Sequence, residues 1–148
     1  MSAQTIAMAS DHAGFDLKEL LKRELQAAGH DILDLGTTGS ATSVDYPDFG
    51  TALAKVIRDG GAGRGVLVCG TGIGISIAAN REPAVRAAVV HDVTSARLAR
   101  QHNDANVIAL GARLVGTEVA KDCVRIFLET PFEGGRHGPR VAKLSAAR

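Results

Sequence analysis

Short apolar segments alternate along the chain with longer segments in which apolar residues recur every three or four positions. The short segments are rich in β-branched residues or alanine, and the longer ones extend over about a dozen residues. This alternation is typical of β-α-β units and of a parallel sheet. It predicts strands at 5–9, 32–35, 66–69, 85–90 and 107–110. Residues 66–69 are apolar on both faces, so we expect the central strand there.

Helices are predicted between these strands. Leu17, Leu20, Leu21 and Leu25 recur at helical spacing in the first of them. The others are expected from Pro47 to about Asp59, after Gly74 to about Asn80, and over 94–101 and 117–128. Residues 130–148 contain few apolar side chains, so we expect this C-terminal arm to pack on its own or on a partner subunit instead of adding to the core.

The amino-acid composition limits the classes of protein to which the chain can belong. The chain has 148 residues, 45% of them hydrophobic, and a net charge of +1, which fits one globular domain over 1–148. The balanced charge and the 3% content of aromatic residues disfavour a nucleic-acid-binding protein. No apolar segment approaches the length of a membrane span. Cys69 and Cys123 lie far apart without CxxC spacing, which indicates reduced thiols in the cytoplasm.

Polar residues follow most of the predicted strands. In open parallel sheets, ligands bind at the carboxyl ends of the strands, so these residues are candidates for a site. They are Ser10-Asp11-His12, Asp45-Tyr46, Cys69-Gly70-Thr71-Gly72, His91-Asp92 and Gly111-Ala112-Arg113, together with the predicted loop 102–106.

Gly70, Gly72 and Gly74 allow backbone N–H groups to face a bound anion. The rival interpretation is a dinucleotide fingerprint in which Asp92 binds the ribose. The third glycine of that motif is missing, because Ile75 stands in its place. An oxyanion or phosphate cradle is therefore the better prediction.

Cys69 falls where a strand meets a helix start, an environment that favours a thiolate, although a small residue closing an apolar strand is an equally good interpretation. Cys123 lies on an apolar helical stripe and is predicted to lie in the core.

His12 and His102 stand among Asp and Asn, where a titrating role competes with a solvated surface position. Arg136, His137 and Arg140 form either a phosphate clamp with Arg113 or a solvated tail. Neither HxxxH nor HExxH occurs, so no metal site is expected.

Five segments in order resemble the B-type ribose-5-phosphate isomerases, the family shared with galactose-6-phosphate isomerase subunits and allose-6-phosphate isomerase. They are SDHAGF from Ser10, DYPDFG from Asp45, CGTGIGISIAANR from Cys69, RQHNDANVIALGAR from Arg100 and EGGRHGPRV from Glu133. The resemblance covers nearly the whole chain. It implies a three-layer α/β/α, Rossmann-like fold with a five-stranded parallel sheet. It also implies a homodimer or homotetramer with shared active sites, and an aldose–ketose isomerase without metal or other cofactor.

The resemblance also implies residue roles. Cys69 would be the base that moves a proton between C2 and C1, and Thr71 with the backbone of Gly70, Gly72 and Gly74 would stabilise the enediolate. One branch of the family uses a glutamate where this chain has Ile75, which assigns this chain to the cysteine branch. His102 would open the sugar ring. Asp11, Asp45, Tyr46 and Asn103 would hold hydroxyls or assist proton transfer, and the phosphate would be bound by His12, Arg113, Arg136, His137 and Arg140.

The implied reaction interconverts ribose 5-phosphate and ribulose 5-phosphate. A hexose 6-phosphate or a tetrose 4-phosphate is the alternative substrate, because pocket length sets that choice and the sequence does not reveal it. A noncatalytic phosphosugar-binding subunit is the more distant alternative.

Overall fold

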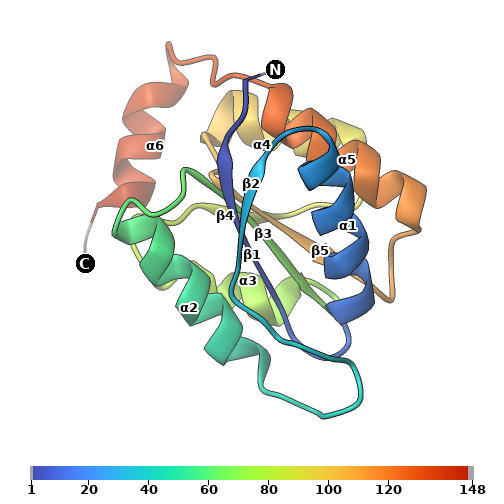
Figure 1. Ribbon diagram of the computed structural model, residues 1–148. Helices are drawn as coiled ribbons and strands as arrows, with labels where there is room; N and C mark the ends of the chain where they lie inside the picture. The colour runs from blue at the N-terminus through green and yellow to red at the C-terminus, as the bar shows by residue number, and fades with distance from the viewer. Residues whose placement is uncertain (1, 147–148) are drawn as a thin grey trace.

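Five parallel strands form one sheet in the order β2-β1-β3-β5-β4 (Figure 1). The computed structural model describes residues 2–146. The strands are β1 (Thr5–Ser10), β2 (Asp31–Asp34), β3 (Arg64–Cys69), β4 (Ala87–Val89) and β5 (Val107–Gly111). The prediction of a five-stranded parallel sheet is confirmed, and β3 is its central strand.

Helices cover both faces of the sheet, which makes the three-layer α/β/α arrangement that was predicted. One face carries α1 (Phe15–Ala27), α4 (Val93–Asn103) and α5 (Thr117–Glu129), and the other carries α2 (Tyr46–Arg58) and α3 (Ile73–Ala79). Successive residues of β3 point to opposite layers, as a strand requires. Val66 and Val68 pack with α1, α4 and α5, whereas Leu67 and Cys69 pack with α2 and α3.

The order in which successive strands are added to the sheet reverses between β1 and β3. From β1 the chain moves outward to β2, and then it crosses back to β3 and continues to the other edge. In parallel α/β sheets this switch point leaves a crevice at the carboxyl ends of the two strands. Residues after β1 and β3 therefore face a common space.

Some predicted boundaries were wrong by a few residues. Strand β2 begins and ends one position earlier than expected. Strand β4 is shorter than 85–90, and just before its start the Arg86 N–H donates to the Asn106 side chain at 2.8 Å. Helix α4 extends to Asn103, so His102 and Asn103 lie in its last turn and not in a loop as predicted. The left-handed backbone of Asp104, with φ of 45°, ends that helix.

The C-terminal arm contains a helix that the sequence pattern did not predict, α6 (His137–Ser145). His137 is its one buried residue, which explains why no apolar periodicity revealed it. The arm is attached to the domain by polar contacts: the Glu133 N–H donates to the Gln101 carbonyl at 3.1 Å, and Arg86 Nη1 donates to Ser145 Oγ at 3.0 Å. Residues 147–148 of the predicted arm lie outside the described residues. Across the described part of the chain, every helix is too short or too polar to span a bilayer.

Candidate active site

A pocket of about 520 Å³ opens at the switch point between β1 and β3, within the size range of small-molecule sites. Residues that follow strands line most of it, and α3 and the start of α2 supply the remainder. Eight of the predicted site residues line this pocket: Asp11, His12, Tyr46, Cys69, Gly70, Thr71, Gly74 and Arg113.

Cys69 is the last residue of β3 and lies at this pocket with only 4% of its surface exposed. Its Sγ accepts a hydrogen bond from the Gly72 N–H at 3.1 Å. An N–H donor aimed at sulfur stabilises negative charge on that atom. The Cys69 side chain thus lies between the pocket and a backbone N–H donor.

The glycine-rich segment after Cys69 takes a shape that side chains would prevent. Gly72 has φ of 77°, in the left-handed region, and a Cβ there would lie 2.9 Å from the Leu110 carbonyl carbon. At Gly74 a Cβ would lie 2.4 Å from the Tyr46 ring. These glycines allow Tyr46 and the start of α3 to line the same pocket as Cys69. The first N–H groups of a helix have no partner within the helix.

The segment after β1 supplies an acid and an imidazole. Asp11 is 6% exposed, and its Oδ1 accepts a hydrogen bond from the Gly14 N–H at 3.0 Å. His12 Nδ1 accepts from the Val44 N–H at 3.1 Å, so the neutral ring carries its hydrogen on Nε2. The loop after β2 therefore fixes the orientation of His12.

Arg113 brings a cation to the pocket from the turn after β5. Its backbone N–H donates to the Gly70 carbonyl at 3.0 Å, which places the arginine beside the glycine segment. The side chain is exposed and free to meet an anion. Two further predicted residues do not line the pocket. Asp45 is exposed and immediately precedes Tyr46, and Gly72 contributes its backbone hydrogen bond to Cys69.

The other five predicted site residues, His102, Asn103, Arg136, His137 and Arg140, do not line this pocket. His102 and Asn103 precede β5, whose first residue Val107 pairs with Gly65 at the start of β3. Cys69 lies four residues further along β3, and four strand residues span about 13 Å. His102 therefore lies near the amino ends of the strands, whereas Cys69 of the same chain lies at their carboxyl ends.

These five residues form a second group around the end of α4 and the start of α6. The imidazole rings of His102 and His137 are stacked, with centroids 4.4 Å apart and 17° between their planes. Burial first, and then the neighbouring charges of His102 and Arg136, lower the pKa of His137, while Glu133 opposes them. His137 Nε2 is 3.8 Å from Glu133 Oε1.

Other candidates from the sequence have structural roles. Asp92 Oδ1 accepts a hydrogen bond from the Ser95 N–H at 2.7 Å and so caps α4, a contact that accounts for the residue without a dinucleotide. Cys123 is fully buried in the core, as predicted, and burial raises the pKa of its thiol to about 11. His91 Nε2 accepts from the Gly111 N–H at 3.2 Å and supports the turn that carries Arg113.

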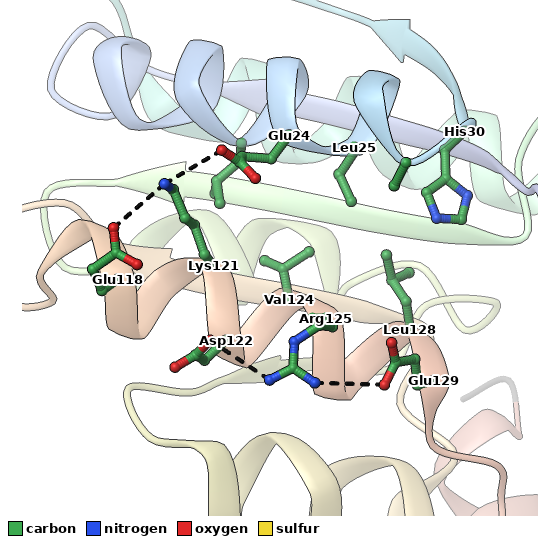
Figure 2. A pocket seen from close by; sticks show the side chains of 12 residues that line it. Glu24, Leu25, His30, Glu118, Lys121, Asp122, Val124, Arg125, Leu128 and Glu129 are labelled. Atoms are coloured by element: carbon green, nitrogen blue, oxygen red, sulfur yellow. Dashed lines mark hydrogen bonds and ion pairs between the residues drawn. The ribbon is translucent and has the colours of Figure 1, made fainter. Parts of the chain in front are cut away.

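Figure 2 shows a different pocket, of about 380 Å³, between α1 and α5. Its charged residues are paired with one another: Lys121 contacts Glu24 at 3.3 Å and Glu118 at 3.4 Å, and Arg125 contacts Asp122 and Glu129, each at 3.6 Å. None of the predicted site residues lines it. The pocket at the switch point is therefore the better candidate for chemistry.

The two groups define the class of protein. A thiol, a glycine-rich backbone segment and cationic side chains at the carboxyl ends of a parallel sheet suit a small anionic ligand that exchanges protons. Residues 6–144 match the model of the Ribose/Galactose Isomerase family, and the chain belongs to that family.

Three relatives show how close the similarity is. The chain is 45% identical to ribose-5-phosphate isomerase B of Escherichia coli over 141 residues, which cover 95% of this chain and 94% of that protein. It is 44% identical to D-erythrulose-4-phosphate isomerase of Pectobacterium atrosepticum, covering 95% and 92%. The crystal structure of a ribose 5-phosphate isomerase from Thermotoga maritima superimposes with a TM-score of 0.94 at 47% identity, covering 97% and 99%.

Three residues that were not predicted lie beside the predicted groups. Ile73 and Ile77 line the pocket from α3 and are 52% and 61% exposed. Their spacing of four residues is that of one helix face, but the helix was predicted to begin only after Gly74, so Ile73 was not assigned to it. Glu133 lies next to His137, and no sequence spacing indicated that it also approaches His102.

Proposed function

We propose that the protein is an aldose–ketose isomerase that interconverts ribose 5-phosphate and ribulose 5-phosphate without a metal ion. The observation that carries the proposal is the position of Cys69, buried at a pocket whose rim holds His12 and Arg113. Membership of the family and the names of the relatives support the substrate class. Under this proposal the enzyme works in the pentose phosphate pathway in the cytoplasm.

The proposed reaction is a proton transfer between neighbouring carbons. The Cys69 thiolate takes the C2 proton of the open-chain aldose, and the C2–H electron pair forms a C1–C2 double bond while the C1 carbonyl oxygen becomes an oxyanion. Backbone N–H groups from Gly70 to Gly74, with Thr71, stabilise this enediolate. Cys69 then returns its proton to C1. The proton of the C2 hydroxyl passes to the C1 oxygen, so that a hydroxyl forms at C1 and a ketone forms at C2.

The remaining predicted residues bind and prepare the sugar. His102 exchanges a proton with the ring oxygen so that the ring opens. Asp11, Asp45, Tyr46 and Asn103 hold hydroxyls or assist proton transfer. His12, Arg113, Arg136, His137 and Arg140 bind the phosphate, whose binding energy positions the reacting carbons.

A complete site requires two copies of the chain. Cys69 and His102 of one chain lie at opposite ends of the parallel strands, so the His102 that serves a given Cys69 comes from a second copy. Ile73 and Ile77 support this arrangement, because they expose apolar surface at the rim of the Cys69 pocket, where a second copy would cover it. In a symmetric dimer the two copies form two equivalent composite sites.

Turnover across a panel of sugar phosphates tests this function. We expect kcat/KM to be highest for ribose 5-phosphate and lower for allose 6-phosphate, galactose 6-phosphate and erythrose 4-phosphate. A higher value for a hexose or tetrose phosphate would reassign the substrate within the isomerases. Binding of ribose 5-phosphate without any turnover would instead support a noncatalytic subunit.

A further inference from the structure

Three side chains with metal-ligating atoms converge at the end of α4 and the start of α6. They are His102, Glu133 and His137, and one ligand atom of each lies within 4.8 Å of the other two. The backbone holds them together: the Glu133 N–H donates to the Gln101 carbonyl at 3.1 Å, next to His102 in sequence. Within residues 2–146, no other three histidine, cysteine or carboxylate side chains are grouped in this way.

The ligand types favour a transition metal. Two imidazoles and one carboxylate form the ligand set of several zinc centres, and imidazole also suits Ni²⁺ and Cu²⁺, whereas Mg²⁺ and Ca²⁺ prefer oxygen. Zinc bonds of 2.0–2.1 Å in a tetrahedron place neighbouring ligand atoms about 3.4 Å apart. His137 Nε2 and Glu133 Oε1 are already 3.8 Å apart, and the Glu133 side chain is 52% exposed and so has room to rotate.

Two features set the expected strength of binding. The imidazole rings of His102 and His137 are stacked, so a bound ion has to turn at least one ring out of the stack. Arg136 and Arg140 are exposed on the same segment, and their charges oppose a cation. We therefore expect weaker binding than in a dedicated structural zinc site, with water or a phosphate oxygen as a further ligand.

We propose that His102, Glu133 and His137 bind a divalent transition metal ion such as Zn²⁺ or Ni²⁺, and that the bound ion inhibits the enzyme. The metal site stands on geometry alone, whereas the inhibition rests on the proposed function of His102. The His102 nitrogen that binds the ion cannot also carry the proton that the ring oxygen of the sugar takes up when the ring opens. The ion thus blocks ring opening.

The metal site is tested by calorimetric titration of Ni²⁺ or Zn²⁺ into Cys69→Ala protein, which removes the pocket thiol as a competing ligand. We expect one ion per chain. Glu133→Gln in the same background should lower the affinity by about tenfold or more. The matched control is Glu118→Gln, on an α5 side chain that is 83% exposed, which should leave the affinity unchanged. No binding, or equal affinity with and without Glu133, would overturn the site.

The inhibition is tested by turnover of ribose 5-phosphate in increasing Zn²⁺. Glu133→Gln should keep the metal-free kcat and require about ten times more Zn²⁺ for half inhibition. Equal sensitivity of the two proteins would show that the ion inhibits elsewhere, for example at Cys69, and would overturn this part. Ion binding by a protein without isomerase activity would support the metal site while rejecting the proposed function.

Discussion

Protonation of Asp34 is predicted to destabilise the protein, because this carboxylate is the partner of a fully buried lysine. Lys18 has no exposed side-chain surface, and its Nζ lies 2.9 Å from Asp34 Oδ1. Burial alone would raise the pKa of Asp34, but hydrogen bonds from Lys18, Lys22 and the Gly36 N–H outweigh it and lower that pKa from 3.8 to about 2. A shift of this size corresponds to about 2 kcal/mol of stability.

The sign of the pH dependence follows from the direction of the shift. The folded state holds Asp34 ionised at pH values where the unfolded chain has already bound a proton. The contribution of about 2 kcal/mol is therefore complete above pH 5 and is lost as the pH falls toward 2. Asp34→Asn should cost about 3 kcal/mol or more at neutral pH, because it leaves the Lys18 ammonium buried with only Glu19 beside it.

Urea unfolding between pH 7 and pH 3, combined with NMR titration of the side-chain carboxyls, measures this effect. We expect the stability difference between wild type and Asp34→Asn to shrink as the pH falls. Asp31→Asn, an exposed aspartate of the same strand, is the matched control and should show little change. A pKa of Asp34 near its ordinary value would contradict this stabilising role of the ionised carboxylate. The titration uses the wild type, so it decides the question even where Asp34→Asn does not fold.

Three further predictions concern the proposed chemistry. Cys69→Ala should lower kcat at least about a hundredfold with a smaller change in KM, whereas Cys123→Ala should stay active; near-normal kcat in Cys69→Ala would exclude the thiolate as the base. His102→Ala should slow turnover of a cyclic sugar phosphate more than that of a tetrose phosphate, which cannot close the same ring; equal losses would assign His102 to another step. Exhaustive chelation of the purified enzyme should leave its kcat/KM unchanged. Loss of activity that a divalent metal restores would contradict the proposed roles.

The sequence was sufficient to predict those strands and helices whose buried residues form a visible apolar pattern. Residues 66–69 are apolar on both faces because β3 is covered by helices on both sides, and the run could be assigned without knowledge of its neighbours. The arm gave no such signal, since α6 buries only His137 and is held by polar contacts such as that between Arg86 and Ser145. Contacts of this kind depend on residues far apart in the chain, which no local periodicity reports.

The candidate site was predictable residue by residue but not as one arrangement. The rule that ligands bind after parallel strands found Asp11, Cys69 and Arg113, and the structure brings all three to one pocket. His102, by contrast, was expected in a loop and in one site with Cys69. The register of β5 against β3 separates the two residues, and that register is a tertiary property.

Subunit mixing tests most directly whether one active site takes Cys69 from one chain and His102 from another, as proposed. Cys69→Ala and His102→Ala proteins, each nearly inactive, are mixed in equal amounts under conditions of demonstrated subunit exchange. Each mixed dimer then contains one site with both changes and one intact site, so the mixture should recover roughly a quarter of wild-type activity. Cys69→Ala mixed with His12→Ala, whose changes lie in the same pocket, should give no activity above the mean of its parents. Absence of recovery with His102→Ala would contradict the shared site.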